Sequence, residues 1–414
     1  MKVFKFGGAS VKNAEAIQNV ARIVTTHNSE PLMIVVSAIG KTTNALEEVV
    51  SGGTANENTA AKIKEIISAH AAIAKDLFPA SHSIHTTIDQ FIGIIRDQLS
   101  AGNGKDKVYD QVVSLGEVLS SLILAQYLQH TGINVEWVDA RRYICTDSNF
   151  REAKVDWELT RSRIAELTEK IKTKILITQG FIGSSPEGDT TTLGREGSDF
   201  SAAIFASCLR ADSVTIWKDV PGVMSADPKR LPTATTFDEL PFREAAEMTY
   251  YGASVIHPKT IKPLANLGIP LLVKNFDNVL LPGTRIHECK VDHLPPLIVF
   301  KENQCLISCH VTDYTFIDES QIGVIFNALS ARNLKVNLIQ NSAISFSFCL
   351  DFKEDSVLEL IRELGKHFEV YYNTGLTLIT IKNYDNESFE KYRKQKGVIL
   401  EQSSRSTLQV LVRS

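Results

Sequence analysis

Apolar positions in the first two thirds of the chain follow two alternating periods. Residues 32–37 (LMIVVS) form a continuous apolar run, as strands buried on both faces do, whereas residues 14–27 repeat apolar side chains at helical spacing. The alternation predicts strands at 3–6, 32–37, 133–138, 174–182 and 213–217, and helices at 14–27, 62–77, 110–128, 158–171 and 200–209. Strands alternating with helices favour an α/β domain with a mostly parallel sheet.

The pattern changes after Pro295 and Pro296, because prolines do not fit a helix interior or a central strand. We therefore expect a first domain at residues 1–292 and a second region at 297–414. The second region predicts strands at 305–311, 335–340, 344–350, 369–372, 376–381, 398–402 and 407–412, with helices between them. This series indicates two ferredoxin-like βαββαβ units, the second of them cut short.

Composition narrows the functional classes. The 414 residues are 43% hydrophobic and 22% charged, with a net charge of −4, which argues against a nucleic-acid or anionic membrane partner. No apolar run approaches the roughly 20 residues needed to span a bilayer, and no secretory leader is expected at the N-terminus. The six cysteines form no C-x-x-C pair. They suggest reduced thiols in a cytoplasmic protein and argue against a zinc site.

The first candidate for chemistry is residues 5–10, KFGGAS, where a strand leads through two glycines toward a helix. Glycines let backbone N–H groups approach an anion, and Lys5 adds a point charge suited to a phosphate. An ordinary strand-to-helix turn with a solvated lysine is the alternative.

Two further segments carry polar side chains next to predicted elements. Residues 37–44 (SAIGKTTN) follow a buried strand, where a polar ligand or a plain helix cap is expected. Glu117 lies in the apolar helix VVSLGEVLSSLILAQYL, where a carboxylate needs a partner or a ligand amine unless it faces solvent.

The segment at 180–199, GFIGSSPEGDTTTLGREGSD, is long for a loop in an α/β domain, and such loops are more often functional than not. It contains Arg195, which can bind a carboxylate with two hydrogen bonds, and Asp199, which is either functional or a helix cap. The next loop, at 216–231, is expected to wrap a nucleotide or to be a plain surface loop.

Together these motifs resemble the aspartate kinase family. KFGGAS, SAIGKTTN, SLGE, TTTLGREGSD, IWKDVPGVMSADPK, YYGASVIHPKTI and VKNFDNVLLPGT occur in the family's order, and the C-terminal modules resemble its ACT regulatory domains. The resemblance implies a three-layer αβα amino-acid kinase domain, of the carbamate-kinase-like type, followed by a ferredoxin-like ACT α+β region. Only residues 55–105 carry no motif that matches.

The resemblance also implies an activity, namely phosphoryl transfer from Mg-ATP to the side-chain carboxylate of L-aspartate. The product, 4-phospho-L-aspartate, begins lysine, threonine and methionine biosynthesis. The implied catalytic residues are Lys5 and Asp199. The implied ATP ligands are Lys5, Gly7, Gly8, Ala9, Lys218, Asp219, Met224, Lys229 and Ser254, and the implied aspartate ligands are Ser37, Thr43, Glu117 and Arg195. No protein side chain is assigned to a metal.

Regulation is expected in the ACT region, where VNLIQNSAISFSF at 336–348 resembles an effector-binding strand pair. The implied ligands of an amino-acid effector, lysine or threonine, are Asn337, Gln340, Asn341 and Ser342. These four are otherwise turn residues of a dimer-forming sheet, and a homodimer through this region is expected.

Four positions depart from the family's usual residues. Ala9 stands where Thr is common, Met224 where Tyr is common, Glu196 where Gly is common, and Ser254 where many members have Lys. Ala9, Glu196 and Ser254 support a rival interpretation, a catalytically degenerate ACT-type amino-acid sensor, and a kinase of another acidic amino acid is a second alternative.

Overall fold

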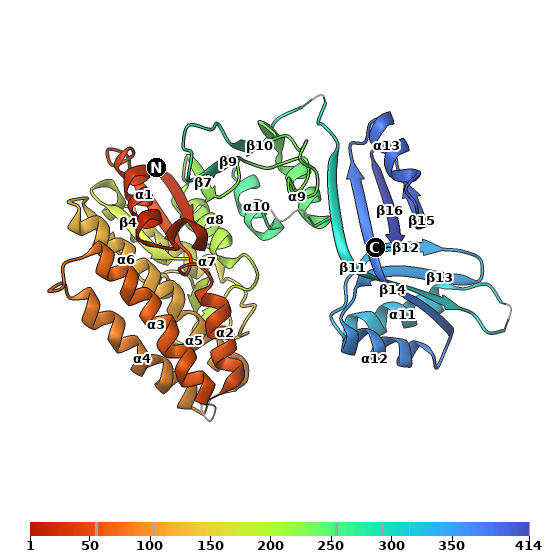
Figure 1. Ribbon diagram of the computed structural model, residues 1–414, viewed down its shortest axis with the longest axis horizontal. Helices are drawn as coiled ribbons and strands as arrows, with labels where there is room; N and C mark the ends of the chain where they lie inside the picture. The colour runs from red at the N-terminus through yellow and green to blue at the C-terminus, as the bar shows by residue number, and fades with distance from the viewer. Residues whose placement is uncertain (54–56, 103, 253–255, 292, 314, 414) are drawn as a thin grey trace. The chain divides into compact units, whose positions relative to one another are not determined.

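The computed structural model describes residues 1–414 except 54–56, 103, 253–255, 292, 314 and 414. The described chain forms two compact units (Figure 1). The first comprises residues 1–223, 236–249 and 254–291, and the second comprises 224–235, 250–253 and 292–414. The division of the catalytic and regulatory regions at 292 and 297 stays a prediction.

The first unit is built on an eight-stranded mixed sheet. Its spatial order is β3 (Val135–Trp137), β4 (Ile175–Gln179), β2 (Leu32–Val36), β1 (Lys2–Phe6), β7 (Ser213–Lys218), β9 (Leu271–Asn275), β10 (Thr284–His287) and β8 (Glu239–Pro241). Strands β3 to β9 in this order are parallel, and β10 runs antiparallel to β9. The chain leaves β1 for β2 on one side and later returns to β7 on the other. Ligand crevices form where the strand order reverses in this way.

Helices cover both faces of this sheet, which confirms the expected α/β sandwich (Figure 1). They are α1 (Ala14–Thr25), α2 (Thr42–Gly52), α3 (Glu57–Leu77), α4 (Ile84–Ser100), α5 (Lys105–Val113), α6 (Leu115–His130), α7 (Trp157–Ala165), α8 (Gly197–Leu209), α9 (Phe242–Tyr250) and α10 (Pro258–Ala265). Short 3-10 turns occur at Gly8–Val11, Ala140–Arg142 and Lys170–Lys172, and β5 (Ile182–Ser184) pairs with β6 (Thr190–Thr192).

The stretch Lys105–His130 is long and apolar enough to cross a membrane, but 78% of its most apolar window is buried inside the protein. A core helix passes the same test of length and composition, so this stretch is weak support for a membrane span.

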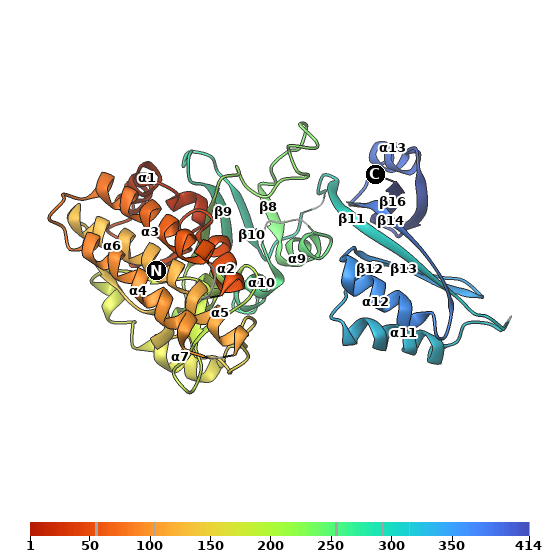
Figure 2. The same cartoon turned by 60° about the horizontal axis from the view of Figure 1, so that its bottom comes forward.

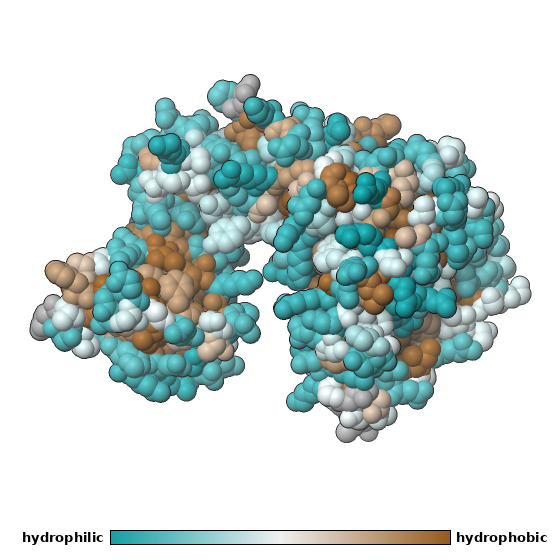
Figure 3. Space-filling model, turned by 180° about the vertical axis from the view of Figure 1, so that it is seen from behind, coloured by the Kyte–Doolittle hydropathy of each residue, from teal (hydrophilic) through white to brown (hydrophobic). Residues whose placement is uncertain are grey.

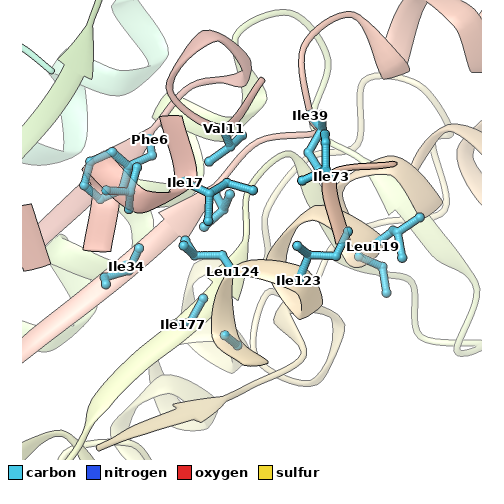
Figure 4. Close-up of a cluster of buried hydrophobic side chains, with 14 of the residues drawn as sticks. Phe6, Val11, Ile17, Ile34, Ile39, Ile73, Leu119, Ile123, Leu124 and Ile177 are labelled. Carbon is cyan, nitrogen blue, oxygen red and sulfur yellow. The ribbon is translucent and has the colours of Figure 1, made fainter. Parts of the chain in front are cut away.

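One face of the sheet carries a large apolar core. Phe6 and Ile34 of the strands pack with Ile17 of α1 and with Ile123 and Leu124 of α6 (Figure 4). Because successive strand side chains point to opposite faces, Lys5 points away from this core and toward α8. The alternation of side chains along β1 therefore places Lys5 on the opposite face of the sheet from this core.

Two predicted elements are interrupted. The helix predicted at 110–128 is split at Ser114 between α5 and α6. The strand predicted at 174–182 ends at Gln179, since Phe181 has φ 72° and Gly180 lies so close to α8 that an added Cβ would come within 2.5 Å of the Ser198 Cβ. The predicted continuation to residue 182 is wrong for this steric reason.

The second unit has a six-stranded antiparallel sheet with three helices. Its order is β12 (Val336–Asn341), β13 (Ser345–Asp351), β11 (Leu297–His310), β14 (Glu369–Lys382), β16 (Thr407–Arg413) and β15 (Val398–Ser403), with helices α11 (Glu319–Ala331), α12 (Glu354–Leu364) and α13 (Asn386–Arg393). The separate strands predicted at 369–372 and 376–381 are one continuous strand, β14. Residues 297–301 of β11 pair with 378–382 of β14, so β11 serves both ferredoxin-like halves.

Candidate functional site

A buried ion-pair cluster lies at the carboxyl ends of β1 and β7. The Nζ atom of Lys5 is 2.6 Å from Oδ1 of Asp199, and the Nζ atom of Lys218 is 3.6 Å from Oδ2 of the same carboxylate. Asp199 is the third residue of α8 and makes no capping hydrogen bond, so it is not a helix cap. Lys5 is buried, which excludes a solvated lysine.

The protonation state of this cluster follows from its charges. Burial acts to raise the pKa of Asp199, but the ammonium groups of Lys5 and Lys218 outweigh it and hold that pKa below its usual value. The carboxylate is therefore ionised and fixes two ammonium groups at one place.

The glycine turn after β1 is shaped by close packing. A Cβ on Gly8 would come within 2.6 Å of the Gly40 carbonyl oxygen and 2.8 Å of the Ala38 carbonyl oxygen. The N–H of Gly40 donates to the carbonyl of Gly8 at 3.0 Å. Gly8 is thus needed to bring the turn after β1 against the loop after β2, where both contribute to one site.

Glu117 is buried in the first turn of α6, which excludes a surface glutamate. Its Oε1 accepts weak hydrogen bonds from the Ala38 N–H and the Thr43 hydroxyl, both at 3.4 Å, and its Oε2 has no hydrogen-bond partner among the described residues. Burial raises the pKa of Glu117 from 4.5 to about 8. A buried carboxylate with an unpartnered oxygen is suited to a cationic group of a ligand.

These groups line one cavity of about 660 Å³ in the first unit. Its basic side chains are Lys5, Arg151, Arg195 and Lys218. Its acidic side chains are Glu47, Glu117, Glu152, Glu196 and Asp199, and Ser37, Gly8 and Thr43 also line it. The cavity therefore brings together the anion-binding turn and the residues expected to bind aspartate.

Arg195 and Glu196 form the turn that leads into α8. Arg195 is exposed at the cavity, and its guanidinium has no hydrogen bond or ion pair with any residue that the structure describes. Glu196 is the N-cap residue of α8 with φ 53° and ψ 28°, a left-handed conformation that favours glycine. The backbone itself thus accounts for a preference for glycine at this position.

The sequence motifs missed a second group of cavity residues. Arg151 has its guanidinium carbon 4.1 Å from the centre of the Tyr109 ring, and the Tyr109 hydroxyl donates to Glu47. The carboxylate of Asp110 accepts from the N–H groups of Arg151 and Thr192 and from the Thr192 hydroxyl. Asp110 therefore positions the loop that carries Arg151. Burial raises the pKa of both Tyr109 and Asp110.

The other described residues expected to bind ATP are not among those that line this cavity. Gly7 caps the 3-10 turn that begins at Gly8, Ala9 is exposed in that turn, and Asp219 is exposed after β7. Met224 and Lys229 belong to the second compact unit, and Ser254 lies outside the described residues. Their role toward a nucleotide stays a prediction.

The four effector candidates differ from one another. The side chain of Asn337 makes its hydrogen bonds within the second unit, since its amide N–H group donates to Gln304 and Asp351 and its oxygen accepts from Lys301. Ser342 shares a hydrogen bond with Ser345, whereas the side chains of Gln340 and Asn341 are exposed at the end of the edge strand β12. Gln340 and Asn341 are therefore the freest of the four to meet a ligand.

The amino acid kinase family matches residues 1–275 of the chain. Among curated proteins, lysine-sensitive aspartokinase 3 of Escherichia coli is 32% identical over 397 residues, which cover 92% of this chain and 87% of that protein. The chloroplastic bifunctional aspartokinase/homoserine dehydrogenase 2 of Arabidopsis thaliana is 35% identical over 389 residues, which cover 90% of this chain. The chain spans 42% of the length of that bifunctional relative.

Solved structures show the same similarity over both units. Escherichia coli aspartokinase III in complex with aspartate and ADP, in the R-state, superposes with a TM-score of 0.85 at 29% identity. The same enzyme in complex with lysine and aspartate, in the T-state, gives 0.84 at 28% identity. Each match covers 100% of this chain and 96% of the solved chain.

Proposed function

The chain belongs to the aspartokinases of the amino acid kinase family, and from that premise we propose that it is an aspartate kinase. It transfers the γ-phosphoryl group of ATP to the side-chain carboxylate of L-aspartate, giving ADP and 4-phospho-L-aspartate. The observation that carries this proposal is the buried Lys5–Asp199–Lys218 cluster in one cavity with Glu117 and Arg195.

The chemistry explains why this cavity has two lysines at its centre and needs no general base. The aspartate side chain has a pKa near ~3.9, so it is already a nucleophilic anion at neutral pH. The barrier is the approach of this anion to the phosphates, which positioning and charge neutralisation lower. We assign Lys5 to the transferred phosphoryl group, Lys218 and the Gly7–Gly8 turn to the other phosphates, and Asp199 to holding both ammonium groups in place.

The amino-acid substrate is held by opposite charges at the two ends of its backbone. We assign Glu117 to the substrate ammonium, because its unpartnered Oε2 is buried at the cavity wall. Arg195 is assigned to the α-carboxylate as a bidentate donor, and Ser37 and Thr43 to further hydrogen bonds. A bound ammonium beside Glu117 would favour its ionised form and offset the effect of burial on its pKa.

ATP is expected with Mg²⁺, which supplies additional neutralisation of phosphate charge when bound. The two ammonium groups held together at Asp199 fit a polyphosphate ligand. The carboxylate of Asp199 forms ion pairs with the two lysines, and we assign no protein carboxylate to the metal.

The test is acyl-phosphate formation. Purified protein with Mg-ATP and L-aspartate is expected to give an aspartyl hydroxamate when hydroxylamine is present, with matched stoichiometric release of ADP. L-Glutamate in a parallel reaction is the control, and faster turnover of glutamate would show a kinase of another acidic amino acid. No hydroxamate with either substrate, together with tight binding of lysine or threonine, would show a non-catalytic sensor.

We also propose that an amino acid, lysine or threonine, regulates the enzyme through the second unit. A structure of the Escherichia coli relative contains lysine, and the exposed ends of β12 in this chain offer polar side chains to such a ligand. The same unit exposes large apolar side chains, including Ile339 and Tyr371, and Figure 3 shows hydrophobic residues on its surface. These support a homodimer through this region, and a cytoplasmic location and a role in lysine and threonine biosynthesis complete the proposal.

A further inference from the structure

Three potential metal ligands converge at one edge of the large sheet in the first unit. Strands β8 and β10 are parallel neighbours there (Figure 2). Glu239 is the first residue of β8, His287 is the last residue of β10, and Cys289 follows two residues later. A carboxylate oxygen, an imidazole nitrogen and the thiol sulfur of these residues all lie within 4.8 Å of one another.

The side chains of His287 and Glu239 lie close together without forming a hydrogen bond. Nε2 of His287 is buried and has no hydrogen bond with the described residues, although Oε1 of Glu239 lies 3.3 Å away. In the tautomer protonated at Nε2 the imidazole would donate to Glu239. In the tautomer protonated at Nδ1 the Nε2 lone pair faces the carboxylate, and a metal ion between the two atoms accepts both lone pairs.

The distance between the His287 nitrogen and the Glu239 oxygen also matches that between two ligands of a tetrahedral zinc ion. Two tetrahedral ligands at about 2.0–2.1 Å from one zinc ion lie about 3.3–3.4 Å apart. The His287–Glu239 separation of 3.3 Å is of this size. Cys289 lies outside regular structure after β10, and its thiol sulfur is within 4.8 Å of the other two ligand atoms.

We propose that Glu239, His287 and Cys289 bind a single zinc-like divalent transition-metal ion, with solvent in the fourth position. A thiolate and a carboxylate balance the 2+ charge, and the imidazole contributes a neutral donor. The nitrogen and sulfur donors select against Mg²⁺ and Ca²⁺, which prefer oxygen ligands. Binding deprotonates the Cys289 thiol, so one proton is released for each ion bound.

The backbone around these ligands is already fixed. Leu240 and Ile286, which are opposite each other in the β8–β10 pairing, are both fully buried. The hydroxyl of Thr284, at the start of β10, donates to the carbonyl of Phe237 and accepts from the N–H of Val223 at 2.8 Å. The ion would cross-link β8, an edge strand of three residues, to the end of β10.

The sequence argued against zinc because the six cysteines form no C-x-x-C pair, and the site proposed here uses only one cysteine. The carboxylate ligand comes from another strand, and its place beside His287 depends on the β8–β10 pairing. None of the three residues lines the cavity assigned to ATP and aspartate, so metal binding and kinase activity are separate claims.

The test is a titration of untagged, chelator-treated protein with Co²⁺ and with Zn²⁺ as the only added ligands. The wild-type protein is expected to bind one equivalent of Co²⁺ with a thiolate-to-cobalt charge-transfer band in the near ultraviolet and the intense visible bands of a tetrahedral site. Zn²⁺ is expected to displace Co²⁺. Cys289→Ser is expected to remove the charge-transfer band, and His287→Asn to weaken binding by at least about 100-fold, more than outer partners usually cost.

Matched controls distinguish this site from adventitious binding. Cys208→Ser removes a thiol elsewhere in the first unit, and Glu288→Gln removes an exposed carboxylate next to the proposed ligands. Both are expected to bind Co²⁺ within about twofold of wild type, as substitutions outside the coordination shell. Glu239→Gln, which preserves side-chain size, provides a second loss-of-ligand variant if His287→Asn fails to fold.

Equal Co²⁺ affinity in wild type, Cys289→Ser and Glu239→Gln would overturn the proposal. So would a wild-type cobalt complex without the thiolate band, or the absence of stoichiometric binding. These readouts do not involve phosphoryl transfer, so a failed kinase assay would leave this result unchanged.

Discussion

The two units of the molecule expose their candidate ligand-binding residues in opposite ways. In the first unit, strand β2 is buried at every residue, and the charged groups of the cavity at the strand ends include the buried Lys5, Glu117 and Asp199. In the second unit, β14 is largely exposed over its first seven residues, and β12 ends in exposed polar side chains. A buried charge has to be explained by a partner or ligand, whereas an exposed side chain needs no explanation.

This difference determines what substitutions can reveal. In the first unit, substitution of a site residue is expected to change both ligand binding and folding, because the same contacts serve both. In the second unit, folding and ligand binding are expected to separate between neighbouring residues of one strand.

The largest effect is expected from Lys5→Met. The variant removes the ammonium group proposed to neutralise the transferred phosphoryl group, and kcat should fall by about 10²–10³-fold or more. Loss of one partner of a buried ion pair also costs about 3–5 kcal/mol of unfolding free energy. Hydroxamate formation and chemical denaturation measure the two effects.

A double variant separates catalysis from folding in this case. In Lys5→Met the Asp199 carboxylate keeps only the longer 3.6 Å contact with Lys218 among the described residues. Adding Asp199→Asn removes this poorly paired buried charge, and the double variant should recover part of the lost stability while remaining inactive. Undiminished turnover of aspartate by folded Lys5→Met would refute the assignment of Lys5.

A smaller loss is expected from Glu117→Gln, which keeps the side-chain size but removes the charge that faces the substrate ammonium. A charged hydrogen bond contributes about 1.5–3 kcal/mol, so aspartate affinity should fall by about 10–100-fold. Isothermal titration with aspartate measures this. Unchanged affinity would exclude Glu117 as the ammonium ligand.

The pH dependence of Glu117 provides an independent check. Since its pKa is raised from 4.5 to about 8 in the ligand-free protein, the folded state holds a proton between these values that the unfolded chain has lost. This contribution to stability is complete below pH 4.5 and is lost as the pH rises through 8. Aspartate binding requires the ionised form, so affinity should rise toward pH 8 in wild type, and Glu117→Gln should show neither trend.

In the second unit, Asn337→Ala and Asn341→Ala form a matched pair on one strand. Asn337→Ala removes the amide that donates to Oε1 of buried Gln304 at 2.8 Å and leaves that oxygen only the weak 3.5 Å contact from the Cys349 thiol, so it should cost about 1–3 kcal/mol of unfolding free energy. Asn341→Ala should change stability by less than about 0.5 kcal/mol, while weakening any inhibition by lysine or threonine. Equal destabilisation by both variants would contradict the distinction between internal and ligand-facing residues.

The sequence predicted those site residues that lie in contiguous motifs. Lys5 was found at a strand end, Glu117 as a carboxylate in an apolar helix, and Arg195 in a long loop. Arg151 was missed because its place depends on the contact between its own N–H and Asp110, which is distant in sequence.

Long-range pairing also limited the prediction of the fold. Local periodicity identified most strands of the second unit, but residues 297–301 pair with 378–382, which no local pattern indicates. The joining of the two ferredoxin-like halves through β11 and β14 was therefore not predicted. The proximity of Glu239 to His287 was not predicted either, because it depends on the long-range pairing of β8 with β10.

The smallest effect is expected at Glu196, where conformation and charge can be separated. Glu196→Gly relieves the left-handed backbone at φ 53° and should raise the unfolding free energy by up to about 1 kcal/mol. Glu196→Gln keeps the backbone strain and should leave stability nearly unchanged. Both variants remove a negative charge next to Arg195, so the KM for aspartate should fall by up to about fivefold in each, because charges near the surface influence one another by about 1 kcal/mol or less. A lower KM in Glu196→Gly alone would show that the backbone conformation, rather than the charge, limits substrate binding at this turn.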